Sequence, residues 1–189
     1  MALGAVPLYL TAKMMLKTRW LALILALGYL IYPSLHYVNL FDFHPIAFAV
    51  PFFLAAFYFL EKKNWLWMGI FLALAAATQE EVIIGAIFVG LYLFLRKEKK
   101  AGLWVLTAAV LYFLLTIKVI MPFAGGGLAR LDRYSQLGHS FTEIIKNFFL
   151  HPGLFLQTIW MWPKFVYVFW LFLPVAFLPF LAWRPAILL

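Results

Sequence analysis

The hydrophobic pattern of the chain centres on a stretch of 31 residues, 65–95, whose only charged side chains are Glu80 and Glu81. A bilayer core is spanned by about 20 apolar residues, and an ionisable group at its centre costs roughly 3 kcal/mol or more. Two adjacent carboxylates in one continuous span would double that cost. The pattern therefore predicts a helical hairpin with arms at 65–78 and 82–95, and a single long tilted helix is the alternative.

The arms of this hairpin are short for a membrane. Each has 14 residues and extends only about 21 Å at 1.5 Å per residue, against a hydrocarbon core of ~30 Å. Charge and polar backbone at membrane depth are tolerated only inside protein or beside a water-filled cavity. We therefore expect the turn at Gln79, Glu80 and Glu81 to lie in such a recess.

Other apolar segments on both sides of the hairpin also predict helices; they are 1–12, 20–32, 46–60, 102–121 and 164–183. Pro33 ends one of them, since proline cannot continue helical hydrogen bonding, and Pro45 suits the first turn of the next. The fold class expected is an all-α integral membrane protein with about six to seven membrane helices. They form one membrane domain over residues 1–189.

A non-spanning region, 122–163, is expected to be an extracytoplasmic loop. Within it, Ser140 and Glu143 fit a helix-capping box, and apolar residues recur at helical spacing over 141–150. A helix of that kind, with one apolar and one polar face, is typical of the membrane interface. The sequence therefore predicts an outer interfacial helix, ended by His151 and Pro152.

Composition supports a membrane protein. The chain is 67% hydrophobic and 20% aromatic, and only 12% of its residues are charged. A soluble domain of this length has too little interior for so much apolar surface. Cysteine is absent, which excludes a disulfide framework and a thiolate metal site.

The net charge of +8 indicates topology and not a nucleic-acid partner, because no basic cluster has the context of a nucleic-acid motif. The loops around 13–19, 61–63 and 96–100, with Arg184, hold all of the net positive charge. The positive-inside rule then places these loops in the cytoplasm. Residues 33–45 and 122–163 become extracytoplasmic in a multi-pass protein of the cell membrane.

The connection 33–45 carries candidate chemistry. Asp42 and His44 lie on either side of Phe43, and alternate residues of an extended segment point the same way. Pro45 favours that extended form at His44. One interpretation is an acid and an imidazole presented together to a substrate or cation; the other is a re-entrant segment in which Asp42 caps the next helix.

Basic residues offer candidate anion sites on the same side. Lys118, near the outer end of the segment 102–121, either binds a phosphate or extends to the lipid headgroups. Arg130 and Arg133 flank Asp132, so they either hold an anion together or one of them neutralises Asp132.

Several motifs in order resemble the DUF2079 family of predicted polytopic membrane proteins of archaea and bacteria. These motifs are YPSLHYVNLFDFHP, the hairpin ending in QEE, KVIMPF, RYSQLGHS and FTEIIKNF, over roughly residues 5–160. The family is similar to GT-C glycosyltransferases, which take sugar from a polyprenyl-phosphate donor at the outer membrane face. The resemblance implies site roles for Asp42, His44, Glu80 and Glu81, and for Arg133 with Tyr134.

The resemblance implies a glycosyltransferase-like module in which Asp42, Glu80 and Glu81 act on the acceptor or hold Mg²⁺ or Mn²⁺. Lys118, Arg133 and Tyr134 would bind the phosphate. The family's acidic outer loop precedes the part of the family matched here, which leaves three interpretations: a partial chain, a partner that supplies the loop, or no catalysis. The second hypothesis is accordingly a non-catalytic subunit of a larger membrane complex, in which Glu80 and Glu81 pair with basic residues of a partner.

Overall fold

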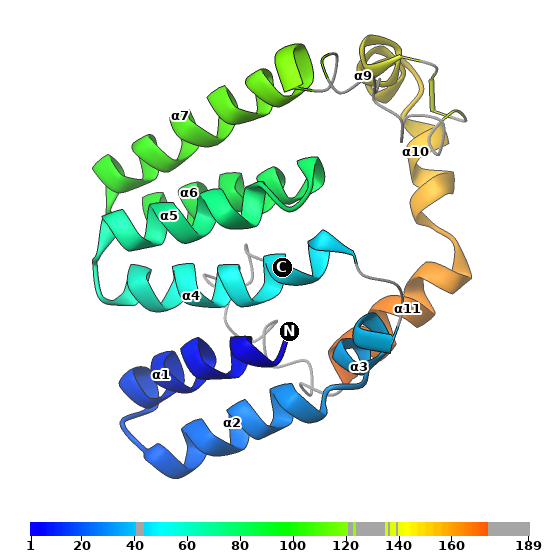
Figure 1. Cartoon of the computed structure of the whole chain (residues 1–189). Helices are drawn as coiled ribbons and strands as arrows, with labels where there is room; N and C mark the ends of the chain where they lie inside the picture. The colour runs from blue at the N-terminus through cyan, green and yellow to red at the C-terminus, as the bar shows by residue number, and fades with distance from the viewer. Residues whose placement is uncertain (41–43, 121–122, 124–134, 136, 139, 174–189) are drawn as a thin grey trace. The chain divides into compact units, whose positions relative to one another are not determined.

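The computed structural model describes residues 1–40, 44–120, 123, 135, 137–138 and 140–173, and every regular element in these ranges is helical. The prediction of an all-α fold is confirmed for this part of the chain. In chain order the elements are η1 Ala2–Gly4, α1 Ala5–Leu16, α2 Arg19–Ile31, α3 Pro33–Leu40, η2 Pro45–Phe48, α4 Ala49–Glu61, α5 Trp65–Ala76, η3 Glu80–Val82, α6 Ile83–Leu95, α7 Lys99–Leu115, a π-helical segment Thr116–Ile120, α9 Phe141–Leu150, α10 Pro152–Ile159 and α11 Trp162–Phe172 (Figure 1).

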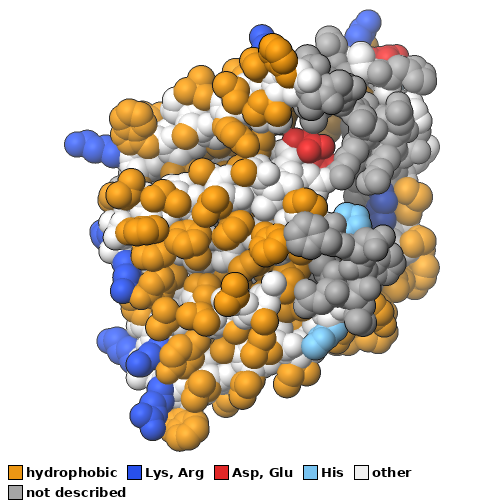
Figure 2. All heavy atoms as spheres, in the orientation of Figure 1, with side chains coloured by type: hydrophobic (Ala, Val, Ile, Leu, Met, Phe, Trp, Pro, Cys, Tyr) orange, Lys and Arg blue, Asp and Glu red, His pale blue; other side chains and the backbone are white. Residues whose placement is uncertain are grey.

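The chain divides into two compact units, Met1–Phe113 and Leu114–Ala186, called unit 1 and unit 2 below. In unit 1, α1 packs against α2 and α4, and α4 packs against α5. The turns α1–α2, α4–α5 and α6–α7 lie at one end of these helices, called the basic end (Figure 1). Their Lys and Arg side chains form the blue group on the left of Figure 2.

Three helices at the basic end stop in the same way. Lys17, Lys63 and Lys97, one just past α1 and the others in the turns after α4 and α6, have left-handed backbones with φ of 55°, 55° and 65°. After α4 and α6 the next amide closes the turn: Asn64 N donates to the Phe59 carbonyl, and Glu98 N to the Leu93 carbonyl, each at 2.9 Å. This is the Schellman hydrogen bond, which satisfies carbonyls at a helix end. Here lysine takes the place that glycine usually has.

The interior of the described structure is built largely from small side chains. Of its eighteen buried apolar residues ten are alanine, including the fully buried Ala22 and Ala75. Large apolar side chains point outward instead, as at Ile24 (62% exposed) and Leu66 (72%). Small residues at helix contacts and large apolar residues outside are typical of helices packed in lipid. The packing thus agrees with the membrane class expected from composition.

Helices α6 and α7 cross closely at two glycines. A Cβ added at Gly102 would lie 2.9 Å from the backbone oxygen of Gly90, and one added at Gly90 would lie 2.7 Å from Leu106 Cγ. Contacts this short are tolerated only without side chains. The crossing therefore depends on both glycines.

The predicted hairpin at 65–95 is confirmed. Helix α5 ends at Ala76 and α6 begins at Ile83, with the turn between them carrying Glu80 and Glu81. The start of α5 is capped by Asn64, whose Oδ1 accepts a hydrogen bond from Trp67 N at 3.3 Å. The alternative of one continuous helix is excluded.

By length and composition, one described helix is long and apolar enough to cross a membrane, the 22-residue helix Lys99–Ile120. The other apolar helices of unit 1 are shorter, at 10–17 residues, and include Arg19–Ile31 and Pro45–Glu61. The predicted count of six to seven membrane helices therefore stays a prediction.

The connection 33–45 contains a helix that was not predicted. Tyr32 is extended and ends α2 before Pro33, as predicted, but Pro33–Leu40 then forms the helix α3. Proline at the first helical position loses no hydrogen bond and has a helical φ, so Pro33 both stops one helix and starts the next. His44, with φ −113° and ψ 122°, has the extended backbone that was predicted from Pro45.

In unit 2 the predicted helix 141–150 is confirmed as α9. Ser140 Oγ accepts a hydrogen bond from Glu143 N at 3.2 Å, the expected cap. Phe148 and Phe149 are exposed on α9, and Trp160 and Trp162 are exposed before and at the start of α11. The last part of the helix expected at 164–183, from residue 174 on, lies outside the described residues.

Candidate functional site

The turn between α5 and α6 is stabilised by its own hydrogen bonds. Thr78 Oγ1 donates to the Ala75 carbonyl at 2.7 Å and caps the end of α5. Gln79 is extended, with φ −167° and ψ 147°, and its carbonyl accepts from Val82 N at 3.1 Å. The chain thus reverses over a few residues and places two carboxylates in succession.

Glu80 and Glu81 form the first turn of the helical segment that leads into α6. Glu80 is half-buried and Glu81 is exposed. The N-terminus of a helix carries partial positive charge, which favours carboxylates there. This favours two acidic residues in an otherwise apolar hairpin, at the end of unit 1 opposite the basic end.

The second predicted group reaches the same end of unit 1. His44 is exposed directly before η2, and η2 and η3 both lie away from the basic end (Figure 1). Asp42, its expected partner, lies outside the described residues. The structure therefore brings His44 and the carboxylate pair to one end of the helices and leaves the arrangement with Asp42 as a prediction.

The predicted phosphate ligands belong to unit 2. Lys118 is exposed and lies in the π-helical segment Thr116–Ile120 that continues α7. Such π-helical segments are often found at functional sites. Arg130, Asp132, Arg133 and Tyr134 lie outside the described residues.

A metal site was predicted from Asp42, Glu80 and Glu81. In the part of the chain that the structure describes, no three His, Asp or Glu side chains come together in a group that could hold a metal ion. Of the three predicted metal ligands, Glu80 and Glu81 are among the described residues. Mg²⁺ ordinarily binds proteins through one or two carboxylates and completes its shell with water and substrate phosphate oxygens. Glu80 and Glu81 could contribute ligands to an ion held in that way, and the predicted third ligand, Asp42, lies outside the described residues.

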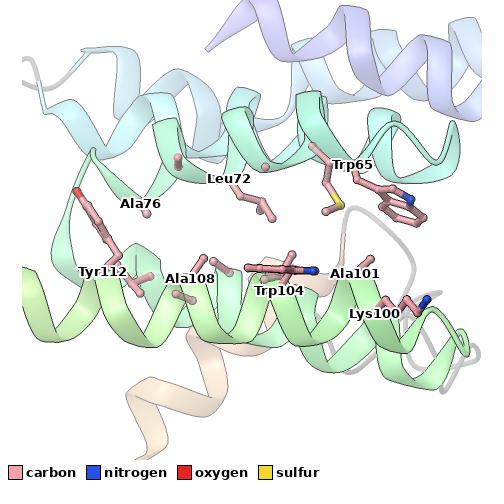
Figure 3. Close-up of a pocket in the computed structure, with 15 residues that line it drawn as sticks. Trp65, Leu72, Ala76, Lys100, Ala101, Trp104, Ala108 and Tyr112 are labelled. Atoms are coloured by element: carbon pink, nitrogen blue, oxygen red, sulfur yellow. The ribbon is translucent and has the colours of Figure 1, made fainter.

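Sequence reasoning missed a cavity of about 650 Å³ in unit 1, which we call the α5–α7 groove. It runs between α5, the start of α6 and α7 (Figure 3). Its lining is Trp65, Met68, Gly69, Leu72, Ala73, Ala76, Ile83, Ala86, Lys100, Ala101, Trp104, Val105, Ala108, Ala109 and Tyr112. The volume is within the range of small-molecule sites in proteins, about 300–1,000 Å³.

The groove has two different ends. Trp65 and Lys100 lie at one end, Ala76 and Tyr112 at the other, and Leu72, Trp104 and Ala108 lie between them (Figure 3). Ala76 and Ile83 are the residues that flank the turn with Glu80 and Glu81. The groove therefore connects the basic end of unit 1 with the carboxylate turn.

Comparison with known proteins gives one positive finding. A family model described as "Predicted membrane protein (DUF2079)" matches residues 1–189. No curated protein and no solved structure matches the chain.

Proposed function

The chain belongs to the DUF2079 family of predicted membrane proteins, and on that premise we propose that it is a membrane module of GT-C glycosyltransferase type. The substrate would be a sugar linked to a polyprenyl phosphate, handled at the outer face of the membrane. The observation that carries the proposal is the α5–α6 turn, which holds Glu80 and Glu81 at the end of the helices opposite the basic loops.

The proposed membrane topology follows from this placement of acidic and basic residues at opposite ends of unit 1. The turns α1–α2, α4–α5 and α6–α7 carry lysine and arginine and face the cytoplasm, as the positive-inside rule requires. The connection 33–45 and the region 122–163 then face outward, and six to seven helices lie in the bilayer. Helices of 12–17 residues in unit 1 fit a locally thinned membrane around the carboxylate turn.

The residues have distinct roles in the proposed reaction. One carboxylate, from Glu80, Glu81 or Asp42, accepts the proton of the acceptor hydroxyl. The oxygen of that hydroxyl then bonds to the anomeric carbon of the sugar. The bond from that carbon to the phosphate oxygen breaks, and the polyprenyl phosphate leaves. His44 lies at the same end as a further proton acceptor.

Phosphate binding falls to Lys118, Arg133 and Tyr134 in this proposal. Mg²⁺ or Mn²⁺ bound at the carboxylates would neutralise charge on the departing phosphate. Arginine suits the phosphate because its planar guanidinium donates two parallel hydrogen bonds, and exposed Lys118 supplies a point charge.

A second function rests on a different observation. The described carboxylates come as a pair without a third acidic or histidine ligand, and large apolar side chains cover the outside of unit 1. A non-catalytic subunit would use both features, with Glu80 and Glu81 paired to basic residues of a partner membrane protein.

The deciding experiment uses the chain purified from its own membranes in mild detergent. The double substitution Glu80→Gln with Glu81→Gln is compared with Glu98→Gln, which removes a carboxylate at the basic end. Transfer of labelled sugar from polyprenyl phosphate is measured in reconstituted membranes, and bound molecules are identified by native mass spectrometry.

The two functions give different results. Loss of transfer only in the double variant, with a polyprenyl-phosphate species bound to the wild type, supports the enzyme. Unchanged transfer excludes the proposed roles of both glutamates. A stoichiometric partner chain that is released only by the double variant makes the protein a subunit.

A further inference from the structure

The α5–α7 groove has the chemistry of an amphiphile site. Its wall consists of apolar and small side chains except at the end where Lys100 lies, and Lys100 is the only charged residue among those that line it (Figure 3). From Lys100 to Tyr112 the α7 backbone advances about 18 Å at 1.5 Å per residue. A long apolar chain with one negative group at its end matches this distribution.

The charge of Lys100 is not used by the ion pairs of the described residues. Two acidic residues at the basic end are paired with other residues: Glu98 with Lys63 at 2.5 Å, and Glu61 with Arg96. Lys100 also lies in the first turn of α7 beside Lys99. Cations are unfavourable at a helix N-terminus, whose amides attract anions. An anion at this position would therefore be stabilised by Lys100 and by α7 together.

The surroundings place this end of the groove at a membrane surface. Trp65 and Lys100 lie at the same end of the groove (Figure 3), and Trp104, also in the lining, is 76% exposed. Tryptophan is enriched at the level of lipid headgroups, and lysines on the cytoplasmic side attract anionic lipids. The basic end of unit 1 has both features.

We infer that the α5–α7 groove binds an acyl chain of one anionic phospholipid from the leaflet at the basic end. The chain lies against Leu72 and Ala108, and the phosphate lies at Lys100 and the N-terminus of α7. The bound lipid fills the space between α5 and α7 that the close α6–α7 crossing leaves open. This site is independent of the proposed sugar transfer, which concerns the opposite end of the helices.

The test uses the full chain, purified in mild detergent and given an equimolar mixture of phosphatidylglycerol and phosphatidylcholine with the same acyl chains. Native mass spectrometry measures the lipid retained. We expect one lipid per chain, with the anionic lipid favoured about fivefold, the effect of one lysine beside an anionic headgroup.

Two pairs of variants test separately how the headgroup and the acyl chain contribute to lipid binding. Lys100→Gln should abolish the preference for the anionic lipid, whereas Lys99→Gln, at a residue outside the lining, should keep it. Gly69→Leu should reduce retention of both lipids by about tenfold because it fills the groove. Gly28→Leu is its control: a Cβ at either glycine meets nothing within 4 Å, but Gly28 is not in the lining.

Several results would overturn the inference. They are no retained lipid in the wild type, an unchanged preference in Lys100→Gln, and undiminished retention in Gly69→Leu. If the wild type were a dimer and Gly69→Leu a monomer, the groove would be a contact between two copies of the chain. Displacement of phosphatidylglycerol by polyprenyl phosphate would assign the groove to the sugar donor. Sugar transfer is measured separately, so a failed lipid site leaves the proposed function standing.

Discussion

Arg96 donates a hydrogen bond from Nη1 to Oε1 of Glu61, and this ion pair joins the α6–α7 turn to the α4–α5 turn. The Glu61 side chain is 11% exposed and that of Arg96 32%. Burial alone lowers the pKa of Arg96, but the hydrogen bond and charge of Glu61 outweigh it and raise that pKa. The same two turns share a second pair, Lys63 with Glu98, whose side chains are 67% and 31% exposed.

The two pairs should differ in their contribution to stability. Arg96→Gln leaves the mostly buried Glu61 without its partner, so we expect a loss of about 1.5–3 kcal/mol, typical of hydrogen bonds to charged groups. Lys63→Gln should cost only ~0–1 kcal/mol, as for exposed pairs. Thermal unfolding in mild detergent measures both. Equal losses would contradict the difference in burial.

Replacement of glycine by alanine should have opposite effects on stability at Gly102, in the α6–α7 crossing, and at Gly28. Gly102→Ala forces a Cβ to within 2.9 Å of the Gly90 carbonyl, and overpacking of this kind costs about 1–3 kcal/mol. Gly28→Ala meets nothing within 4 Å and should add about 0.5–1 kcal/mol through helix propensity. The midpoint of thermal unfolding should fall in the first variant and rise in the second.

The cap of α9 predicts a local effect in unit 2. Ser140→Ala removes the acceptor for Glu143 N and should destabilise the first turn of α9 by about 1 kcal/mol. Hydrogen exchange of the full chain in detergent should then be faster at Glu143, with no change in α5. Ser140→Asp is the control, because aspartate also caps helices and should keep the slow exchange. Equal exchange in all three proteins would show that the cap contributes nothing.

The absence of cysteine makes the proposed topology directly testable. A single cysteine introduced by Lys62→Cys, in the basic α4–α5 turn, should react with an impermeant maleimide only after intact cells are opened. Ala77→Cys, an exposed position beside the carboxylate turn, should react from outside. Labelling of both positions from the same side would exclude the proposed orientation of the hairpin.

Sequence reasoning located the hairpin because its signal is local. Two carboxylates in an apolar run make a single span costly, which favours a turn like the one found at Gln79 to Val82. The cap of α9 at Ser140 is also local, since it needs residues only three positions apart. Both features were predicted with nearly the bounds that the structure gives.

The groove was missed because it depends on tertiary packing. It exists because α7 approaches α6 at Gly90 and Gly102 and leaves space beside α5, and nothing in the sequence shows which glycines meet. The helix at Pro33–Leu40 was missed for another reason. Proline was taken as the end of a helix, although its fixed φ and missing amide also suit a first turn.

The three lysines with left-handed backbones bear on the proposed orientation of the protein in the membrane. A left-handed backbone costs a residue with a Cβ about 1–2 kcal/mol more than glycine, so Lys17, Lys63 and Lys97 together give up roughly 3–6 kcal/mol. As a result, each of the turns α1–α2, α4–α5 and α6–α7 has a lysine where glycine would carry no charge. In the proposed topology these cations add to the positive charge of the cytoplasmic turns. Glycine at all three positions should therefore raise the stability of the fold and weaken the charge signal that orients the chain in the membrane.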